Sequence, residues 1–285
     1  MSNAPSKLEA RVLLSDLAYV ESPRWRDGRL WFAHWGRDEV VAVDLDGTSD
    51  VVAPGSPRLG WSIDWLPDGR LLVTGDELRR REPDGTMVRH ADLSAITEHG
   101  WNEIVVDGRG NIYVNSICFD FLTGGEPKAG IIALVTPDGS VRQVADGLEF
   151  PNGMVVTPDN ATLIISESFA GRLTAFDIET DGALANRRSW ADGIGPDGIT
   201  LDADGAIWTG SGGKGAVRVA RGGEVLETVE LDRDPFACML GGPDGRTLFV
   251  LAAEWRGPEH VDEAITDRTG RVLVADAPSP RAGWP

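Results

Sequence analysis

Cysteine and histidine are scarce in this sequence of 285 residues, which contains two cysteines and four histidines. Two cysteines cannot build a disulfide framework, so Cys118 and Cys238 are predicted to be reduced thiols, buried as small hydrophobic side chains. The histidines show no spacing typical of metal ligands. The sequence therefore indicates neither a cysteine–histidine metal site nor a thiol nucleophile with a histidine partner.

Basic residues and long apolar segments are also few. The 27 lysines and arginines stand against 45 aspartates and glutamates, so the formal net charge is −18. Such a charge repels nucleic-acid phosphates, which leaves a small-molecule substrate as the expected partner. No segment approaches the roughly 18 apolar residues of a membrane span, and the N-terminal residues show no secretory signal. We expect a cytoplasmic protein; its oligomeric state does not follow from the sequence.

Glycine and proline, by contrast, are abundant, with 35 and 17 residues, and they punctuate a repeat. In six places a turn signal such as Asp-Gly precedes a β-rich run. The anchor residues of these runs are Leu30, Leu71, Ile112, Leu163, Ile207 and Leu248, at spacings of 41, 41, 51, 44 and 41 residues. A period of about 40–50 residues made of strands and turns is typical of four-stranded propeller blades. The sequence therefore predicts an all-β fold, a six-bladed β-propeller, with an insertion in the third blade near residues 118–130.

Each end of the chain carries one further strand pattern, at residues 10–14 and 271–274. A closed ring has to protect the edge strand of its last blade. We therefore expect the N-terminal strand to complete the sixth blade. The prediction is a single domain over residues 1–285, with a structured core over about residues 10–278.

The innermost strand of each predicted blade begins 9 to 11 residues before its anchor. The residues at this position are Glu21, Ser62 (or Trp61), Asn102, Asn152, Asp197 and Ala237 (or Phe236). Side chains at equivalent positions of successive inner strands converge at one end of the channel. Buried carboxylates there would repel each other unless a cation lay between them.

Carboxylate and amide oxygens without histidine or cysteine are ligands typical of Ca²⁺ or Mg²⁺. Ca²⁺ is preferred because it accepts loose geometry, with Mn²⁺ or Zn²⁺ as alternatives. The predicted ligands are Glu21, Asn102, Asn152 and Asp197. The other interpretation is that these residues only cap strand starts and turns, which is common for one residue and rare for four in register.

Several segments share the pattern of one known family. They are Glu-Ser-Pro-Arg-Trp at 21–25, Phe-Pro-Asn-Gly-Met at 150–154, Pro-Asp-Gly-Ile-Thr-Leu-Asp at 196–202 and Ala-Gly-Trp-Pro at 282–285. Together they resemble the family of senescence marker protein, gluconolactonase and luciferin-regenerating enzyme, over about residues 10–285. The resemblance implies a six-bladed propeller with one divalent cation in its channel. It also implies that Glu21, Asn152 and Asp197 are metal ligands, that Asn102 touches metal or substrate, and that Asp197 is the general base.

The third blade departs from that family pattern. Sugar lactonases of the family commonly carry an arginine where this sequence has Gly100. The loss of a charged donor predicts a substrate with fewer hydroxyl groups, and Trp101 is expected to make the pocket more apolar. Trp101, Asn102 and Glu103 are the predicted substrate contacts here. Asp120, in the insertion, is another, with a solvated loop acid as the alternative.

The predicted function is metal-dependent hydrolysis of a lactone or a related ester. The metal would polarise the carbonyl group, and Asp197 would accept a proton from the attacking water. One alternative is a non-catalytic propeller that binds a ligand or protein, with a structural cation. Another is a different reaction at the same site, such as that of an isomerase, a cyclase or a phosphotriesterase. Converging oxygen ligands favour the enzyme, because a scaffold has no need of them.

Overall fold

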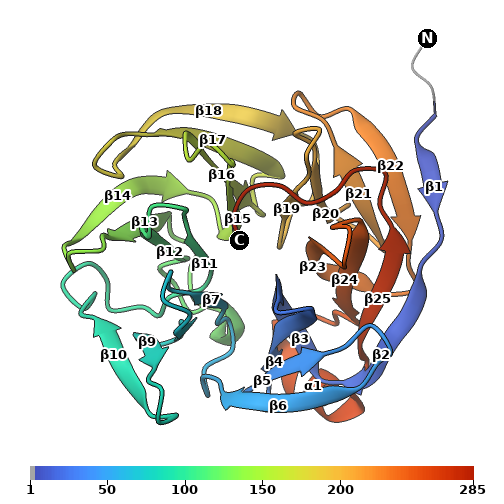
Figure 1. Ribbon diagram of the computed structural model, residues 1–285, viewed down its shortest axis with the longest axis horizontal. Helices are drawn as coiled ribbons and strands as arrows, with labels where there is room; N and C mark the ends of the chain where they lie inside the picture. The colour runs from blue at the N-terminus through green and yellow to red at the C-terminus, as the bar shows by residue number, and fades with distance from the viewer. Residues whose placement is uncertain (1–3) are drawn as a thin grey trace.

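Six β-sheets surround a central channel in the computed structural model, which describes residues 4–285 (Figure 1). Each sheet is one blade, and one strand of each blade lies nearest the channel. The predicted six-bladed β-propeller is confirmed. Residues 1–3, which the single-domain prediction includes, lie outside the described residues.

The first three blades follow one another along the chain, each running from its innermost strand outwards. Blade one consists of β3 (Tyr19–Arg26), β4 (Arg29–Trp35), β5 (Glu39–Val43) and β6 (Ser49–Pro54). Blade two consists of β7 (Ile63–Trp65), β8 (Leu71–Val73), β9 (Leu78–Arg81) and β10 (Met87–Ala91). Blade three consists of β11 (Ile104–Val106), β12 (Ile112–Ser116), β13 (Gly130–Val135) and β14 (Val141–Leu148).

The last three blades repeat this antiparallel order. Blade four consists of β15 (Pro151–Val156), β16 (Thr162–Glu167), β17 (Arg172–Ile178) and β18 (Leu184–Asp192). Blade five consists of β19 (Thr200–Leu201), β20 (Ile207–Gly210), β21 (Gly215–Val219) and β22 (Val225–Glu230). Blade six consists of β23 (Asp234–Gly241), β24 (Thr247–Ala253), β25 (Gly270–Asp276) and β2 (Arg11–Leu17).

The N-terminal strand closes the ring as predicted. Strand β2 pairs antiparallel with β25, with Val12 opposite Leu273. The structure adds a strand that the sequence did not predict, β1 (Ser6–Leu8), which pairs in parallel with β22 and extends blade five. The N-terminal segment therefore covers the outer strands of blades five and six, which would otherwise be open to pairing with another chain.

The predicted turn signals join the innermost strand of a blade to its second strand. In blade two, Gly69 has a φ of +87°, and the Asp68 carboxylate accepts a hydrogen bond from the Arg70 N–H at 3.1 Å. Blade four has Asn160 at the corresponding turn, with a φ of +56°, which asparagine tolerates better than most residues. Each tight turn needs such a residue at one place, and this requirement makes the repeat visible in the sequence.

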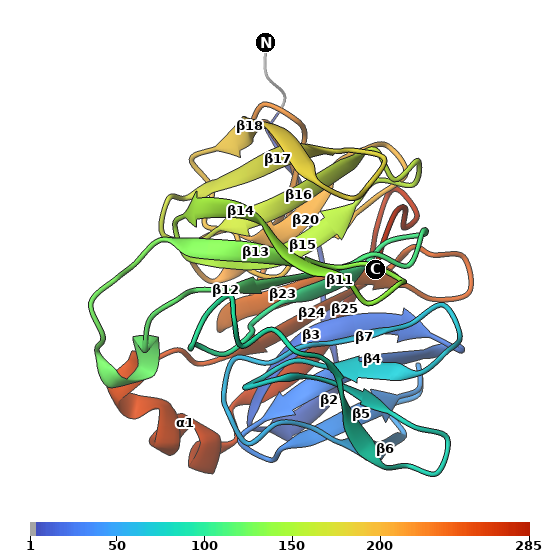
Figure 2. The same ribbon diagram turned by 90° about the vertical axis from the view of Figure 1, so that its left-hand side faces the viewer.

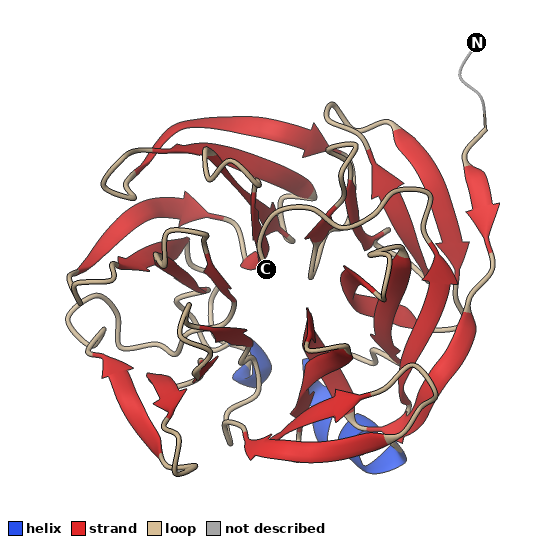
Figure 3. Ribbon diagram, viewed as in Figure 1, coloured by secondary structure: helices blue, strands red, loops and turns tan. Residues whose placement is uncertain are grey.

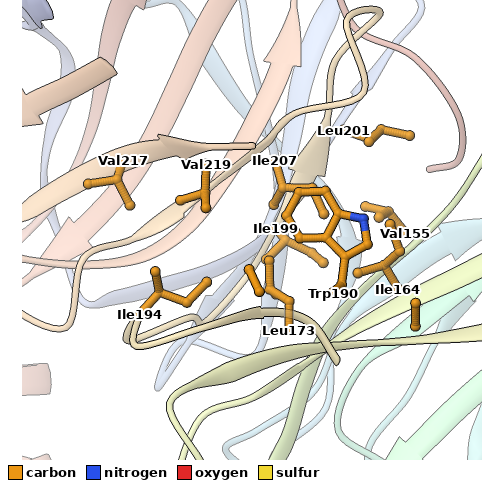
Figure 4. Close-up of a cluster of buried hydrophobic side chains, with 12 residues drawn as sticks. Val155, Ile164, Leu173, Trp190, Ile194, Ile199, Leu201, Ile207, Val217 and Val219 are labelled. Atoms are coloured by element: carbon orange, nitrogen blue, oxygen red, sulfur yellow. The ribbon is translucent and has the colours of Figure 1, made fainter. Parts of the chain in front are cut away.

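Apolar side chains fill the space between neighbouring blades. Figure 4 shows the cluster between blades four and five, where Ile164 and Leu173 face Ile207 and Val217. The anchor Ile207 is fully buried. Burial of such a side chain stabilises the fold by about 1.5–3 kcal/mol. The inner strands are therefore held at fixed positions around the channel.

Helices are few, and they lie on one face of the ring (Figures 2 and 3). The predicted insertion lies between β12 and β13 and contains η1 (Phe121–Thr123). A second insertion, between β24 and β25, contains η2 (Pro258–His260) and α1 (Val261–Asp267). Over residues 4–285, no helix has the length and apolar character to cross a membrane.

Candidate functional site

A cavity of about 610 Å³ opens at one end of the channel. The predicted site residues that line it are Glu21, Asn102, Asn152, Asp197 and Asp120. Glu21 lies in β3 and Asn152 in β15, whereas Asn102 and Asp197 lie just before β11 and β19. We call Glu21, Asn102, Asn152 and Asp197 the floor of the cavity. The inner strands of blades one, three, four and five thus bring four oxygen-bearing side chains to one place.

Hydrogen bonds from neighbouring strands hold the backbone of the floor. The Asn102 N–H donates to the carbonyl of Asn115 at 2.8 Å, and the Asn102 carbonyl accepts from Thr74 Oγ1 at 2.7 Å. The Asp197 carbonyl accepts from Ser166 Oγ, also at 2.7 Å. The floor residues are therefore positioned by the blades behind them before any ligand arrives.

Side-chain atoms of the floor, in contrast, are poorly satisfied by the protein. Asp197 Oδ1 is buried and has no hydrogen-bond partner among the described residues. Asn102 Nδ2 donates to the Pro151 carbonyl at 3.3 Å, which leaves the amide oxygen to bind another group. Glu21 is 2% exposed, and its carboxylate accepts from the Ser22 N–H at 2.5 Å. A buried oxygen without a partner costs free energy, so the floor fits a bound group that takes oxygen ligands.

The electrostatics of the floor point to a positively charged group. Burial raises the pKa of Asp197 to about 8, and the charge of Glu103 contributes, while a hydrogen bond from Asn152 opposes the shift. Burial, followed by the charge of Asp197, raises the pKa of Glu21 well above its usual range. Both shifts mean that the ionised carboxylates lack a compensating positive charge. A cation between Glu21 and Asp197 would provide that charge.

The donor set narrows the choice of cation. In the part of the chain that the structure describes, no three histidine, cysteine, aspartate or glutamate side chains form a metal-binding cluster. A cation at the floor would therefore depend on the Asn102 and Asn152 amide oxygens in addition to the two carboxylates. Oxygen ligands of this kind fit Ca²⁺ or Mg²⁺. Cys238 is buried, and burial raises the pKa of its thiol, which argues against a thiolate ligand.

The structure places two of the predicted substrate contacts outside the cavity. Trp101 is 2% exposed and packs in the core with Leu72 and Ile104. Glu103 is also buried; its carboxylate accepts from Ser62 Oγ at 2.6 Å and lies 3.8 Å from Arg24 Nη2. The physical reason is that successive side chains of an extended chain point in different directions. Asn102 faces the cavity, so its two neighbours do not.

Asp120 does line the cavity, at the edge where the insertion of blade three begins. Its side chain is 62% exposed, and its Oδ1 lies 3.8 Å from His99 Nδ1. Glu21 is buried and Asp197 is partly buried with its Oδ1 atom out of contact with solvent, so Asp120 lies in a different environment. Its position suits a contact with a bound molecule at the entrance rather than with a buried cation.

A guanidinium group lies beside Gly100 even though the arginine of the family pattern is absent there. A Cβ atom at position 100 would lie 2.7 Å from Arg58 Nε and 2.8 Å from Arg58 Cζ. Arg58 comes from the segment between β6 and β7 and lines the cavity. Its Nη1 atom lies 3.4 Å from Asp76 Oδ1. The prediction that this part of the pocket lacks a charged donor was therefore wrong. Glycine at position 100 leaves the space that the Arg58 side chain occupies.

Aromatic side chains around the cavity are the largest group that the sequence did not predict. Besides Trp35, they are Tyr19, Phe119, Phe121, Phe150, Phe169, Phe236 and Trp255, and we call these seven the aromatic wall. Each ring contacts at least one other ring of the wall, with centroids 4.4–6.3 Å apart. Apart from Phe119 and Phe121, these residues are far apart in the sequence, and the set shares no spacing. Their proximity in the fold could therefore not be predicted from a pattern in the sequence.

The smaller cavity, about 360 Å³, lies at the other end of the channel and is lined by Arg24, Asp64 and Trp284 among others. Its two carboxylates are already satisfied. The Asp64 side chain accepts from the N–H groups of Trp65 and Val106, at 2.8 and 2.7 Å, and the Asp107 side chain accepts from those of Arg109 and Asn111, both at 2.8 Å. The floor, with its unpartnered Asp197 oxygen, is therefore the better candidate site.

A family model described as the SMP-30/Gluconolactonase/LRE-like region matches residues 19–254. The chain belongs to this family. The resemblance seen in the sequence is thereby confirmed.

Three curated relatives of the chain carry different names. Pentonolactonase XacC of Haloferax volcanii is 28% identical over 282 residues, which cover 93% of each chain. Regucalcin of Xenopus laevis is 29% identical over 174 residues, which cover 55% of this chain and 58% of that protein. Diisopropyl-fluorophosphatase of Loligo vulgaris is 24% identical over 192 residues, or 61% of each chain. Membership of the family therefore leaves the substrate open.

Solved structures of the family share the propeller. Luciferin-regenerating enzyme superimposes with a TM-score of 0.80 at 17% identity, covering 97% of this chain and 98% of that one. A regucalcin from Agrobacterium tumefaciens, described as calcium-binding, gives a TM-score of 0.79 at 22% identity and covers 99% and 97%. At these identities the likeness bears on the fold alone.

Proposed function

We propose that this protein hydrolyses lactones or related esters with the help of one divalent cation, Ca²⁺ by preference. The observation that carries the proposal is the floor itself, where Glu21 and Asp197 meet Asn102 and Asn152, and where Asp197 Oδ1 is buried without a partner. The relative named pentonolactonase, matched over 93% of both chains, supports a lactone as the substrate.

The floor residues have distinct parts in this reaction. Glu21 and Asp197 would hold the cation with their negative charge, and Asn102 and Asn152 would hold it with neutral oxygens. The chemistry that the cation offers when bound is positive charge, which keeps both carboxylates ionised and polarises the lactone carbonyl.

Asp197 is the proposed general base. One of its oxygens would hold the cation, and the other would accept a proton as water adds to the carbonyl carbon. The acyl–oxygen bond of the ring then breaks, and the proton passes to the departing alkoxide, which gives a hydroxy acid. Among the described residues that line the cavity, Arg58 is the only cationic side chain, and it is suited to bind the carboxylate that ring opening creates.

A second candidate is hydrolysis of a phosphorus ester or fluoride at the same floor. The match to diisopropyl-fluorophosphatase of Loligo vulgaris favours it. A phosphoryl oxygen could take the place of the carbonyl oxygen without any change in the roles of Glu21 or Asp197.

The test is a panel of lactones, carboxylic esters and phosphotriesters, assayed with the chelator-treated protein before and after addition of Ca²⁺, Mg²⁺, Mn²⁺ or Zn²⁺. We expect lactone hydrolysis that disappears with chelator and returns best with Ca²⁺. Activity that survives complete removal of metal contradicts the proposed role of the floor. Phosphotriester turnover without lactone turnover selects the second candidate. A protein that binds Ca²⁺ but hydrolyses nothing would instead be a non-catalytic propeller.

A further inference from the structure

The aromatic wall gives the cavity an apolar side directly above a polar floor. Phe150 and Phe169 stack at 4.4 Å with an interplanar angle of 29°. Phe150 also occupies the left-handed backbone region, with a φ of +58°, which is rare for a bulky side chain. Phe150 lies two residues before Asn152, so a strained backbone places this ring next to the floor.

Two insertions from opposite blades complete the wall across the mouth of the cavity. Phe121 comes from the insertion of blade three, and Trp255 comes from that of blade six. Their rings stack at 6.2 Å with an interplanar angle of 15°. Figure 2 shows the loop between β12 and β13 reaching toward α1 on the same face of the ring. The contact therefore bridges the entrance.

Part of this wall is exposed to solvent. Phe169 is 53% exposed and Trp255 is 37% exposed. Exposed aromatic surface that is continuous with a cavity marks a site for an apolar group, because covering it releases the water around it. The cavity, at about 610 Å³, also exceeds what a bare lactone ring requires and lies in the range that buries a drug-sized ligand.

We propose that the aromatic wall binds an aryl substituent of the substrate, so that the preferred substrates are aryl-substituted lactones rather than polyhydroxylated sugar lactones. This inference rests on the proposed lactone hydrolysis for its chemistry. A sugar lactone needs a polar partner for each hydroxyl group, and Phe121, Phe150 and Phe169 offer none. An aryl ring, by contrast, gains contact area and stacking on the wall.

The test compares three substrates that share the γ-lactone ring: one with a phenyl substituent on the γ-carbon, one with a methyl group there, and a pentonolactone. The phenyl and methyl compounds release the same kind of alkoxide, so their difference reports on the binding of the substituent. We expect kcat/KM of the wild type to be about 10- to 100-fold higher for the phenyl compound, the factor that burial of one aromatic ring supplies.

The variant is Trp255→Ala, and its matched control is Trp284→Ala, which removes a tryptophan of similar exposure, 39%, from the cavity at the other end of the channel. Trp255→Ala should lower kcat/KM for the phenyl lactone about tenfold and change that for the methyl lactone less than about threefold. Phe169→Ser serves as a second variant, because its exposed side chain contributes little to folding.

Binding of the phenyl-substituted γ-lactam, measured by calorimetry, separates this inference from the proposed function. A lactam that binds the wild type and loses about tenfold in affinity with Trp255→Ala supports the aromatic wall even if no lactone is hydrolysed. Three results would overturn the inference. They are equal kcat/KM values for all three lactones, a preference for the pentonolactone, and a lactam that does not bind.

Discussion

The floor and the mouth of the cavity are built in opposite ways. The floor consists of buried or partly buried side chains on or beside the innermost strands, and hydrogen bonds from the blades behind them hold its backbone. The mouth consists of the aromatic wall, whose rings come mainly from insertions and loops, with Tyr19 and Phe236 at the ends of inner strands; rings such as Phe169 are half exposed. The difference teaches that a propeller can keep a reaction centre on its rigid repeat and adjust which molecules reach it with the loops alone.

The largest expected effect comes from the floor. Asp197→Asn keeps the size of the side chain and one oxygen donor but removes the proposed proton acceptor. General-base catalysis typically contributes about 10²–10⁴-fold, so kcat at saturating Ca²⁺ should fall by that factor. The measurement is a steady-state assay over a range of metal concentrations.

Asp120→Asn is the matched control, since it changes the same residue type at the edge of the same cavity, on a side chain that is 62% exposed. It should change kcat less than about threefold, as expected for a solvated side chain. Equal effects of Asp120→Asn and Asp197→Asn on kcat would contradict the claim that the floor, and not the mouth, carries the reaction.

A smaller effect is expected from Arg58, which lies between the two regions. Arg58→Leu removes the proposed partner of the product carboxylate while keeping an aliphatic side chain at this position. Loss of one charge-assisted hydrogen bond should weaken inhibition by the product hydroxy acid about tenfold and leave inhibition by the neutral lactam unchanged. Inhibition constants for both compounds provide the measurement. Equal weakening of both would show that Arg58 shapes the pocket without recognising charge.

The pKa shifts predict a further effect, on stability. In the metal-free protein, folded Asp197 keeps its proton up to about pH 8, whereas an unfolded chain releases it near about pH 4. Between these values the folded state binds more protons, so the free energy of unfolding falls as pH rises.

The melting temperature of the chelator-treated protein should therefore drop by roughly 5 °C or more between about pH 5 and pH 8.5, and Ca²⁺ should restore it. Asp197→Asn should reduce this pH dependence, whereas Asp120→Asn should retain it. A slope unchanged by Asp197→Asn would assign the pH dependence to other groups.

Much of the floor could be predicted from the sequence because it belongs to the repeat. The position before each anchor is the same place in every blade, so register in the sequence becomes proximity in space. The neighbours of Asn102 could not be placed in this way. Trp101 packs in the core, whereas the Glu103 carboxylate accepts a hydrogen bond from Ser62, and composition does not reveal which surroundings a residue has.

The mouth could not be predicted, for a different physical reason. The spacing of anchors exposes an insertion only when another anchor follows it. The insertion that carries Trp255 comes after Leu248, the last anchor, so it lengthens no spacing between two anchors. The rings of Phe121, Phe150 and Trp255 gather only when three separate loops meet on the folded ring.

The central claim is that the floor holds one divalent cation, and calorimetric titration of Ca²⁺ into chelator-treated protein tests it most directly. Wild type should bind one Ca²⁺ per chain. Asn102→Ala, which removes a neutral oxygen, should bind more weakly, and Glu21→Ala, which removes one of two opposing charges, should bind most weakly of the three. Wild-type protein that binds no divalent cation, or Glu21→Ala protein that binds Ca²⁺ as tightly as the wild type, would contradict the account.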